Sequence, residues 1–302
     1  MKWKKIVLVA LFPIVLLGIW HFFIKNYNYK ITFKTHQIPA NVYNQIIKYN
    51  DGESNNNKVV SVLNKTPFNE IQQELKCGDS IIKLNWFLSK VNDSTTLVTL
   101  KIKDEVHSFT QNLQVIFFKN AFIKKRISKA IEFGENMNYE AQSYKISSVT
   151  KAETPEFNCA YISLESTIEN KAMTMLKNIE ILTNYIRDNN MEISSDPFSE
   201  ITYWNIVNDS IKFNFCFPIK DMHNYPVSQS IKIKKTVKKE ALKIVYNGNY
   251  RESDKAWFGI IEYSKSNKIS IKMTPFEVYL NDPHQGGNAL EWKADVYMPI
   301  EP

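Results

Sequence analysis

One acidic residue near the C-terminus lies in a segment that is otherwise apolar and aromatic. Glu277 belongs to the Phe-Glu-Val-Tyr stretch at 276–279, between Pro275 and the turn-forming Asn-Asp-Pro at 281–283. Side chains alternate between the faces of a strand, so Glu277 and Tyr279 are expected on one face. Burying a carboxylate among apolar side chains costs free energy unless a cation or a hydrogen-bond donor contacts it. Either a cationic or hydrogen-bonding partner meets Glu277, or the carboxylate is solvated on an ordinary half-exposed strand, and the stretch alone leaves both open.

Asp295 is a second carboxylate in such a segment. It lies in Ala-Asp-Val-Tyr-Met-Pro-Ile at 294–300, two positions before Tyr297. In a cleft lined by rings, each aromatic face adds about 0.5–2 kcal/mol to the attraction of a cation. The aromatic candidates for the walls of such a cleft are Tyr203, Trp204, Trp257, Tyr279 and Tyr297. By themselves these residues leave two interpretations open, a ligand-binding site and two solvated carboxylates on an open sheet face, and each ring is equally typical of a core or a surface.

The region from residue 156 to 302 repeats one order of elements: strand, helix, strand, strand. The two passes are predicted at 159–164, 168–189, 197–203 and 211–219, then at 242–246, 254–263, 275–279 and 291–300. Aligning Phe-Pro-Ile at 217–219 with Met-Pro-Ile at 298–300 gives an apolar face in both halves, which we expect to pack under the helices. With Tyr203 set against Tyr279, Glu277 and Asp295 are expected on the face away from the helices. The pattern predicts one sheet backed by two helices, its halves related by a pseudo-twofold axis.

Three motifs of this region resemble the GyrI-like small-molecule-binding domain. They are Asn-Tyr at 249–250, Pro-Phe-Glu-Val-Tyr-Leu-Asn-Asp-Pro at 275–283 and Ala-Asp-Val-Tyr-Met-Pro-Ile at 294–300. The resemblance implies a duplicated β-α-β-β fold with a cleft for amphipathic, often cationic molecules, in which a buried acid and aromatic rings recognise the ligand. It therefore predicts a ligand-binding site formed by Glu277, Asp295 and the five aromatic candidates. That effector-binding domain occurs in the DNA gyrase inhibitory protein and in drug-responsive regulators of the MerR and AraC types. Glu277 matches the acid of the family's Pro-x-Glu-x-Tyr pattern, whereas Asp295 stands where glutamate is more usual, which shortens its reach.

These features lead to three hypotheses about function. The leading one is a membrane-anchored protein that captures amphipathic, cationic or drug-like molecules in the GyrI-like cleft. The alternative, also implied by the resemblance, is a hydrolase of reactive small molecules, with Glu277 as general base and Tyr279 or Tyr297 as the orienting hydroxyl. A protein-interaction role like that of a gyrase inhibitor is the third.

The N-terminal residues 1–27 are predicted to form a transmembrane anchor. The apolar run at 6–24 is interrupted only by Pro13, Gly18 and His21. At about 1.5 Å per residue it nearly crosses a hydrocarbon core of roughly 30 Å. No small-x-small cleavage site follows the run, which argues against a removed signal peptide. The flanking lysines predict a single-pass cell-membrane protein with its soluble part outside the cytoplasmic membrane.

Residues 28–145 are predicted to form a separate α+β domain. A strand at 29–36, a short helix from Pro39, strands between 58 and 102 and a long helix over 112–138 follow one another. This order resembles the START/polyketide-cyclase-like superfamily (SRPBCC, helix-grip fold). The resemblance implies an antiparallel sheet around a long C-terminal helix. A cavity between sheet and helix is also implied, without nominating any ligand-binding residue.

Length and composition fit two globular domains. The 302 residues are 44% hydrophobic with a net charge of +7, and the polar stretch at 146–155 is predicted as the linker. Without a helix-turn-helix, zinc-finger or arginine-rich motif, a nucleic-acid partner is not expected. The three cysteines and five histidines show no metal-ligand spacing. We therefore expect no metal and no cofactor, a small molecule as ligand and the membrane as partner.

Overall fold

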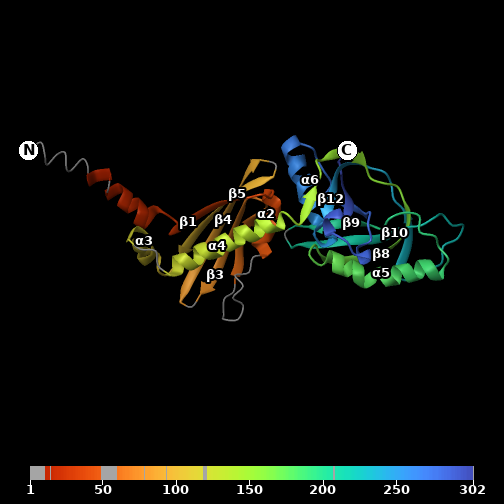
Figure 1. Cartoon of the computed structure of the whole chain (residues 1–302), viewed down its shortest axis with the longest axis horizontal. Helices are drawn as coiled ribbons and strands as arrows, with labels where there is room; N and C mark the ends of the chain where they lie inside the picture. Colours follow the sequence, from red (N-terminus) through yellow and green to blue (C-terminus); the bar gives the residue numbers. More distant parts are fainter. Residues whose placement is uncertain are drawn as a thin grey trace, which may run out of the picture. The chain divides into compact units, whose positions relative to one another are not determined.

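The computed structural model describes residues 11–13, 15–48, 60–77, 79–92, 94–117, 121–206 and 208–301. The chain divides into two compact units, Met1–Ala141 and Gln142–Pro302. Each unit has a sheet of its own, so each is described by itself (Figure 1).

The first unit contains a five-stranded antiparallel sheet with the order β1-β5-β4-β3-β2. Its strands are β1 (Tyr29–Thr35), β2 (Val60–Thr66), β3 (Glu70–Cys77), β4 (Ser80–Asn92) and β5 (Thr95–Asp104). Its helices are α2 (Pro39–Lys48), α3 (Ser108–Phe117) and α4 (Ala121–Glu140), and α4 lies along the sheet (Figure 1). The alternation in β4 buries Leu84, Trp86 and Leu88, and Trp86 donates a hydrogen bond to Gln73. The helical pattern predicted over 112–138 corresponds to two helices, and the helix-grip assignment stays a prediction.

The N-terminal segment is helical where the structure describes it. Residues 11–13 and 15–19 are α-helical and lead into the π-helix η1 (Trp20–Ile24). Across the described residues, no helix has both the length and the apolar character that a membrane span requires. Residues 6–10 of the predicted span lie outside the described part, so the anchor stays a hypothesis.

The second unit is built on a nine-stranded sheet with the order β11-β8-β10-β9-β13-β14-β12-β6, and β7 also pairs with β12. The strands are β6 (Tyr144–Ile146), β7 (Thr150–Glu153), β8 (Asn158–Thr167), β9 (Phe198–Asn205), β10 (Ser210–Pro218), β11 (Ile231–Lys235), β12 (Glu240–Gly248), β13 (Phe276–Tyr279) and β14 (Lys293–Pro299). The main helices are α5 (Lys171–Asp188) and α6 (Asp254–Asn267). The six central strands are β8-β10-β9 followed by β13-β14-β12. From either edge inward, each group of three is ordered as the first, third and second strand of its unit in the chain. Two strand–helix–strand–strand units account for this order, while a duplication of the sequence itself stays a prediction.

The segment predicted as a linker belongs in part to this sheet. Residues of β6 and β7 pair with β12 in antiparallel register. The sequence hid these strands because edge strands are short and mostly exposed, so they need no apolar alternation. The irregular polar character of 146–155 therefore marks a sheet edge as well as the approach to the boundary between the units.

Candidate functional site

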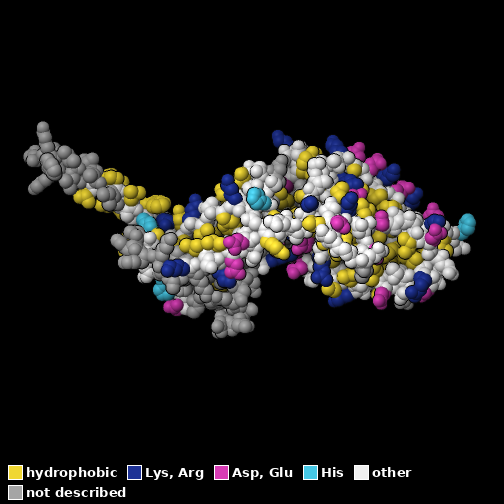
Figure 2. Space-filling model, viewed as in Figure 1, with side chains coloured by type: hydrophobic (Ala, Val, Ile, Leu, Met, Phe, Trp, Pro, Cys, Tyr) yellow, Lys and Arg dark blue, Asp and Glu magenta, His cyan; other side chains and the backbone are white. Residues whose placement is uncertain are grey.

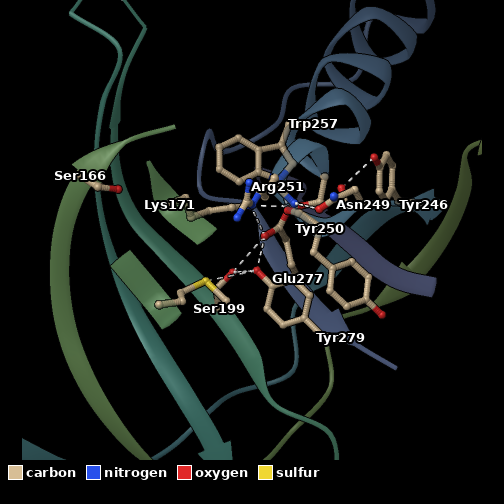
Figure 3. Close-up of polar contacts among 12 residues, drawn as sticks. Ser166, Lys171, Ser199, Tyr246, Asn249, Tyr250, Arg251, Trp257, Glu277 and Tyr279 are labelled. Atoms are coloured by element: carbon tan, nitrogen blue, oxygen red, sulfur yellow. Dashed lines mark hydrogen bonds and ion pairs between the residues drawn. The ribbon is translucent and has the colours of Figure 1, made fainter. Parts of the chain in front are cut away.

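Glu277 lies on β13, at the centre of the second sheet. Across the sheet it pairs with Ser199 of β9 on one side and with Val296 of β14 on the other. Its side chain points toward the helices, where Lys171 from the start of α5 and Trp257 of α6 meet it (Figure 3). The carboxylate is completely buried, with an exposed fraction of 0%.

The prediction that Glu277 faces away from the helices is wrong. In the sheet Glu277 stands between Ser199 of β9 and Val296 of β14, and Val296 belongs to the apolar face that was expected to pack under the helices. Directly paired residues share a face, so Glu277 lies on the same face as Ser199 and Phe215, which is opposite Ser199 on β10. The apolar face that was expected to pack under the helices therefore contains the carboxylate.

Four groups donate hydrogen bonds to the Glu277 carboxylate. The indole Nε1 of Trp257 lies 2.8 Å from Oε1, and the Tyr279 hydroxyl lies 2.6 Å from Oε2. The Ser199 hydroxyl is 3.1 Å from Oε2, and the ammonium of Lys171 forms an ion pair with the same oxygen. The lone pairs of a buried carboxylate are thus satisfied by the protein itself.

Lys171 is the unexpected member of the site. Its side chain is 1% exposed, its Nζ donates to the Ser253 hydroxyl at 3.0 Å, and it lies 4.6 Å from the centre of a Trp257 ring (Figure 3). A cation held between a carboxylate and an aromatic face is the arrangement that the sequence predicted for a ligand. In this structure a side chain of the protein supplies that cation.

The electrostatics of the pair keep Glu277 ionised. Burial raises the pKa of the carboxyl, but the charge and hydrogen bond of Lys171, the hydrogen bond from Tyr279 and the nearby hydroxyl of Ser253 outweigh it and hold the pKa below its ordinary value. The pKa of Tyr279 is raised well above its ordinary value, first by burial and then by the charge of Glu277. Tyr279 therefore remains a neutral hydrogen-bond donor to an ionised carboxylate.

Of the other predicted residues, Trp257, Tyr279 and Trp204 lie on the Glu277 side of the sheet. The ring of Trp204 packs edge-on against that of Trp257, with centroids 5.2 Å apart. A bulge between β9 and β10 shifts the pairing from Lys212–Tyr203 to Phe213–Ile201 and leaves Thr202 unpaired. Because of this extra residue, Ile201 and Trp204 both face the helices, and the side chain of Tyr203 is left largely exposed.

Asp295 and Tyr297 lie on the opposite face. They stand beside Val278 and Phe276 of β13, whose side chains point away from Glu277. The Asp295 carboxylate accepts a hydrogen bond from Lys243 at 2.7 Å and one from the Tyr297 hydroxyl at 3.3 Å. The predicted set of seven residues is therefore divided by the sheet between two environments.

The site also contains residues that the sequence analysis missed. Lys171, Ser199 and Ser253 contact one another or Glu277, and Tyr250 packs against Tyr279 with ring centroids 5.1 Å apart. Lys171 could have been found, since it falls on the same helical stripe as the buried residues Leu182 and Ile186. A lysine on a buried stripe requires a partner, and Glu277 was already the candidate.

The geometry does not favour the hydrolase hypothesis. Tyr279 is beside Glu277, but Tyr297 lies across the sheet from it. A general base works best with a pKa near the operating pH, and Lys171 moves the pKa of Glu277 the other way. The arrangement suits electrostatic recognition better than proton abstraction.

Comparison with known proteins assigns this half of the chain to a class of ligand-binding proteins. Residues 147–301, just over half of the chain, match the family of the GyrI-like small molecule binding domain. The chain thus belongs to the GyrI-like family. A search of curated proteins finds no match.

The similarities to solved structures are low in both sequence identity and TM-score. The C-terminal domain of EcmrR is 14% identical with a TM-score of 0.45, over 52% of this chain and 98% of that one. A hydrolase from Listeria innocua is 10% identical with a TM-score of 0.35, over 51% and 91%. SAV2435, solved bound to tetraphenylphosphonium, is 8% identical with a TM-score of 0.36, over 51% and 94%. At these values the similarities assign no ligand or activity to this chain.

Proposed function

We propose that this protein binds an amphipathic organic cation at Glu277, and that the ligand's charged group replaces the ammonium of Lys171. The observation that carries the proposal is the cation site itself, in which a buried carboxylate and the Trp257 ring hold an ammonium group. The lysine shows which chemistry this site accepts. It also acts as a tethered competitor, so a ligand has to displace it.

The surroundings of the ion pair support an amphipathic rather than a purely ionic ligand. Trp204, Trp257 and Phe258 form a cluster of rings with centroid separations of 5.2 and 5.7 Å from Trp204. The Trp204 Nε1 is buried and has no hydrogen-bond partner within the described residues. Such a donor is satisfied when a neighbour or a ligand supplies an acceptor. A ligand with an apolar body and a polar group fits these features.

Chemical rescue tests the proposal. In Lys171→Ala the site loses the ammonium and the three methylene groups beyond Cβ, and n-butylammonium supplies an ammonium on a short alkyl chain. We expect this compound to raise the melting temperature of Lys171→Ala in a concentration-dependent way, because binding to the folded state alone stabilises it. The matched control is Lys243→Ala, which removes a lysine paired with Asp295 on the other face.

The difference between charged and neutral compounds decides the outcome. n-Butanol has a similar shape but no charge, so it should stabilise Lys171→Ala much less than n-butylammonium does. Equal stabilisation by the two compounds, or equal rescue of Lys171→Ala and Lys243→Ala, would show that Glu277 is not a cation site. In the wild type, n-butylammonium should have little effect, since Lys171 fills the site.

We also propose that the N-terminal segment attaches the protein to a membrane. Its apolar side chains are exposed along the described helix, with Phe12 65% and Phe23 77% accessible, and they cover much of the segment's surface (Figure 2). Exposed apolar surface of this kind marks membrane or protein contacts. Co-sedimentation with phosphatidylcholine vesicles tests it. The full chain should sediment and a Phe12→Ser/Leu16→Ser/Phe23→Ser variant should do so less, whereas equal sedimentation contradicts the proposal.

A further inference from the structure

A cavity lies on the face of the second sheet away from Glu277, and lysines outnumber carboxylates around it. It has a volume of about 210 Å³. Phe276 of β13 lines it, together with Glu200 and Thr202 of β9 and residues from the segment that precedes β12. Phe276 and Glu200 are paired across the two central strands, so the cavity lies over the middle of the sheet. Neither Lys171 nor Glu277 is part of its lining, so a ligand here would be independent of the proposed cation site.

Positive charge is in excess around this cavity. The carboxylate in its lining, Glu200, forms an ion pair with Lys234 and accepts a hydrogen bond from Asn214 at 3.1 Å. Two further lysines, Lys239 and Lys272, line the cavity. Within the part of the chain that the structure describes, neither of their ammonium groups forms an ion pair. Three lysines against one carboxylate leave a local excess of positive charge.

The rest of the lining combines hydroxyl groups with apolar surface. Four threonines contribute, namely Thr154, Thr202, Thr236 and Thr274. Val237 and Pro299 complete the apolar part with Phe276. Binding sites of this composition use a few polar groups to orient a mainly apolar ligand. The volume is below the roughly 300–1,000 Å³ that drug-sized ligands occupy, so the ligand should be smaller.

We propose that this cavity binds a small organic anion, a carboxylate that carries one apolar group. Lys239 and Lys272, which form no ion pair within the described residues, receive the ligand's carboxylate. The apolar group of the ligand lies against Phe276. Burial raises the pKa of Glu200, but Lys234, Asn214 and Lys239 outweigh this and lower it, so the carboxyl stays ionised and its pairing with Lys234 persists. An organic cation, by contrast, would have to displace Lys234 and would lie near two more lysines.

Three compounds of nearly equal size separate the effect of charge from that of shape. Benzoate, benzamide and benzamidinium carry negative, zero and positive charge on the same ring. In isothermal titration calorimetry with the full chain, we expect benzoate to bind at least tenfold more tightly than benzamide, and benzamidinium to bind more weakly still. In Lys171→Ala, n-butylammonium should not compete with benzoate, because it is directed to the other face.

Variants then locate the binding site. Lys272→Gln and Lys239→Gln should each weaken benzoate binding about fivefold or more, and the double variant further. The control is Lys220→Gln, which makes the same change of charge at an exposed lysine that pairs with Glu192 at 2.6 Å and lies outside the lining. The proposal is overturned if benzoate binds no more tightly than benzamide or if benzamidinium binds best. It is also overturned if Lys272→Gln, Lys239→Gln and their double variant all bind benzoate like the wild type.

Discussion

The two faces of the second sheet contain the same kind of ion pair in different surroundings. Under the helices, Lys171 and Glu277 have exposed fractions of 1% and 0%. On the other face, Lys243 and Asp295 are 24% and 18% exposed, and Lys234 and Glu200 are 24% and 25% exposed. Water can still solvate each charge of the second group when its partner is removed, but it cannot reach Glu277. A lysine–carboxylate contact therefore says little about its energetic role until its burial is known.

Removal of the Lys171 charge should cause the largest change in stability among the variants that test this contrast. Lys171→Met keeps most of the side-chain volume but leaves the Glu277 carboxylate buried without a cation. Breaking a buried pair in this way costs about 3–5 kcal/mol. We expect a loss of that order in the free energy of unfolding, measured by urea denaturation of the full chain.

The double variant Lys171→Met/Glu277→Leu provides the control. Replacement of both partners by apolar groups removes the uncompensated charge, so much of the lost stability should return. If the double variant is as unstable as Lys171→Met, packing rather than charge explains the loss. If Lys171→Met costs no more than a change on the open face, the contrast between the two faces is wrong.

Much of the second unit could be predicted from its sequence, because its elements are periodic. The helix expected at 168–189 is α5 (Lys171–Asp188), and the one expected at 254–263 is α6 (Asp254–Asn267). Trp257 and Tyr279 were both predicted near Glu277, and both donate to it. Local spacing is sufficient for the two helices and for Tyr279, which lies two residues from Glu277 on the same strand, whereas Trp257 was one of five aromatic candidates for the cleft that the family resemblance implied.

Spacing within one element could mark Lys171 as a buried lysine that needs a partner, but it could not establish its contact with Glu277. Lys171 and Glu277 are 106 residues apart, and their contact depends on how α5 packs on the sheet. The face of Glu277 depended on strand register, and a shift in register exchanges the two faces of a strand. The bulge at Thr202 changed the register of Trp204 in the same way. Alternation along one strand defines which residues share a face, but not which face is covered.

The pH dependence of stability tests the buried pair with a smaller expected effect than Lys171→Met. The pKa of Glu277 is lower in the folded state than its unfolded value of about 4.3. Its contribution to stability is therefore fully present above about pH 4.3, and it is lost as the pH falls through the folded pKa. We expect the wild type to lose more stability than Glu277→Gln between pH 5 and pH 3, in urea denaturation at each pH. Parallel curves for the two proteins would mean that the pair adds no stability of its own.

The smallest expected effect is on the open face, at Asp295. In Asp295→Asn the side chain keeps its shape and can still accept a hydrogen bond from Lys243 or Tyr297, which lie 2.7 and 3.3 Å from its Oδ2. The ammonium of Lys243 also lies 5.2 Å from the Tyr297 ring, so it retains an attractive neighbour when the charge is lost. For a pair that water can reach, we expect a change in unfolding free energy of about 0–1 kcal/mol. Denaturation in low and high salt separates the two faces further, because screening weakens exposed pairs far more than buried ones. A loss of several kcal/mol in Asp295→Asn would place the open face in the same energetic class as Glu277 and remove the distinction that burial is argued to make.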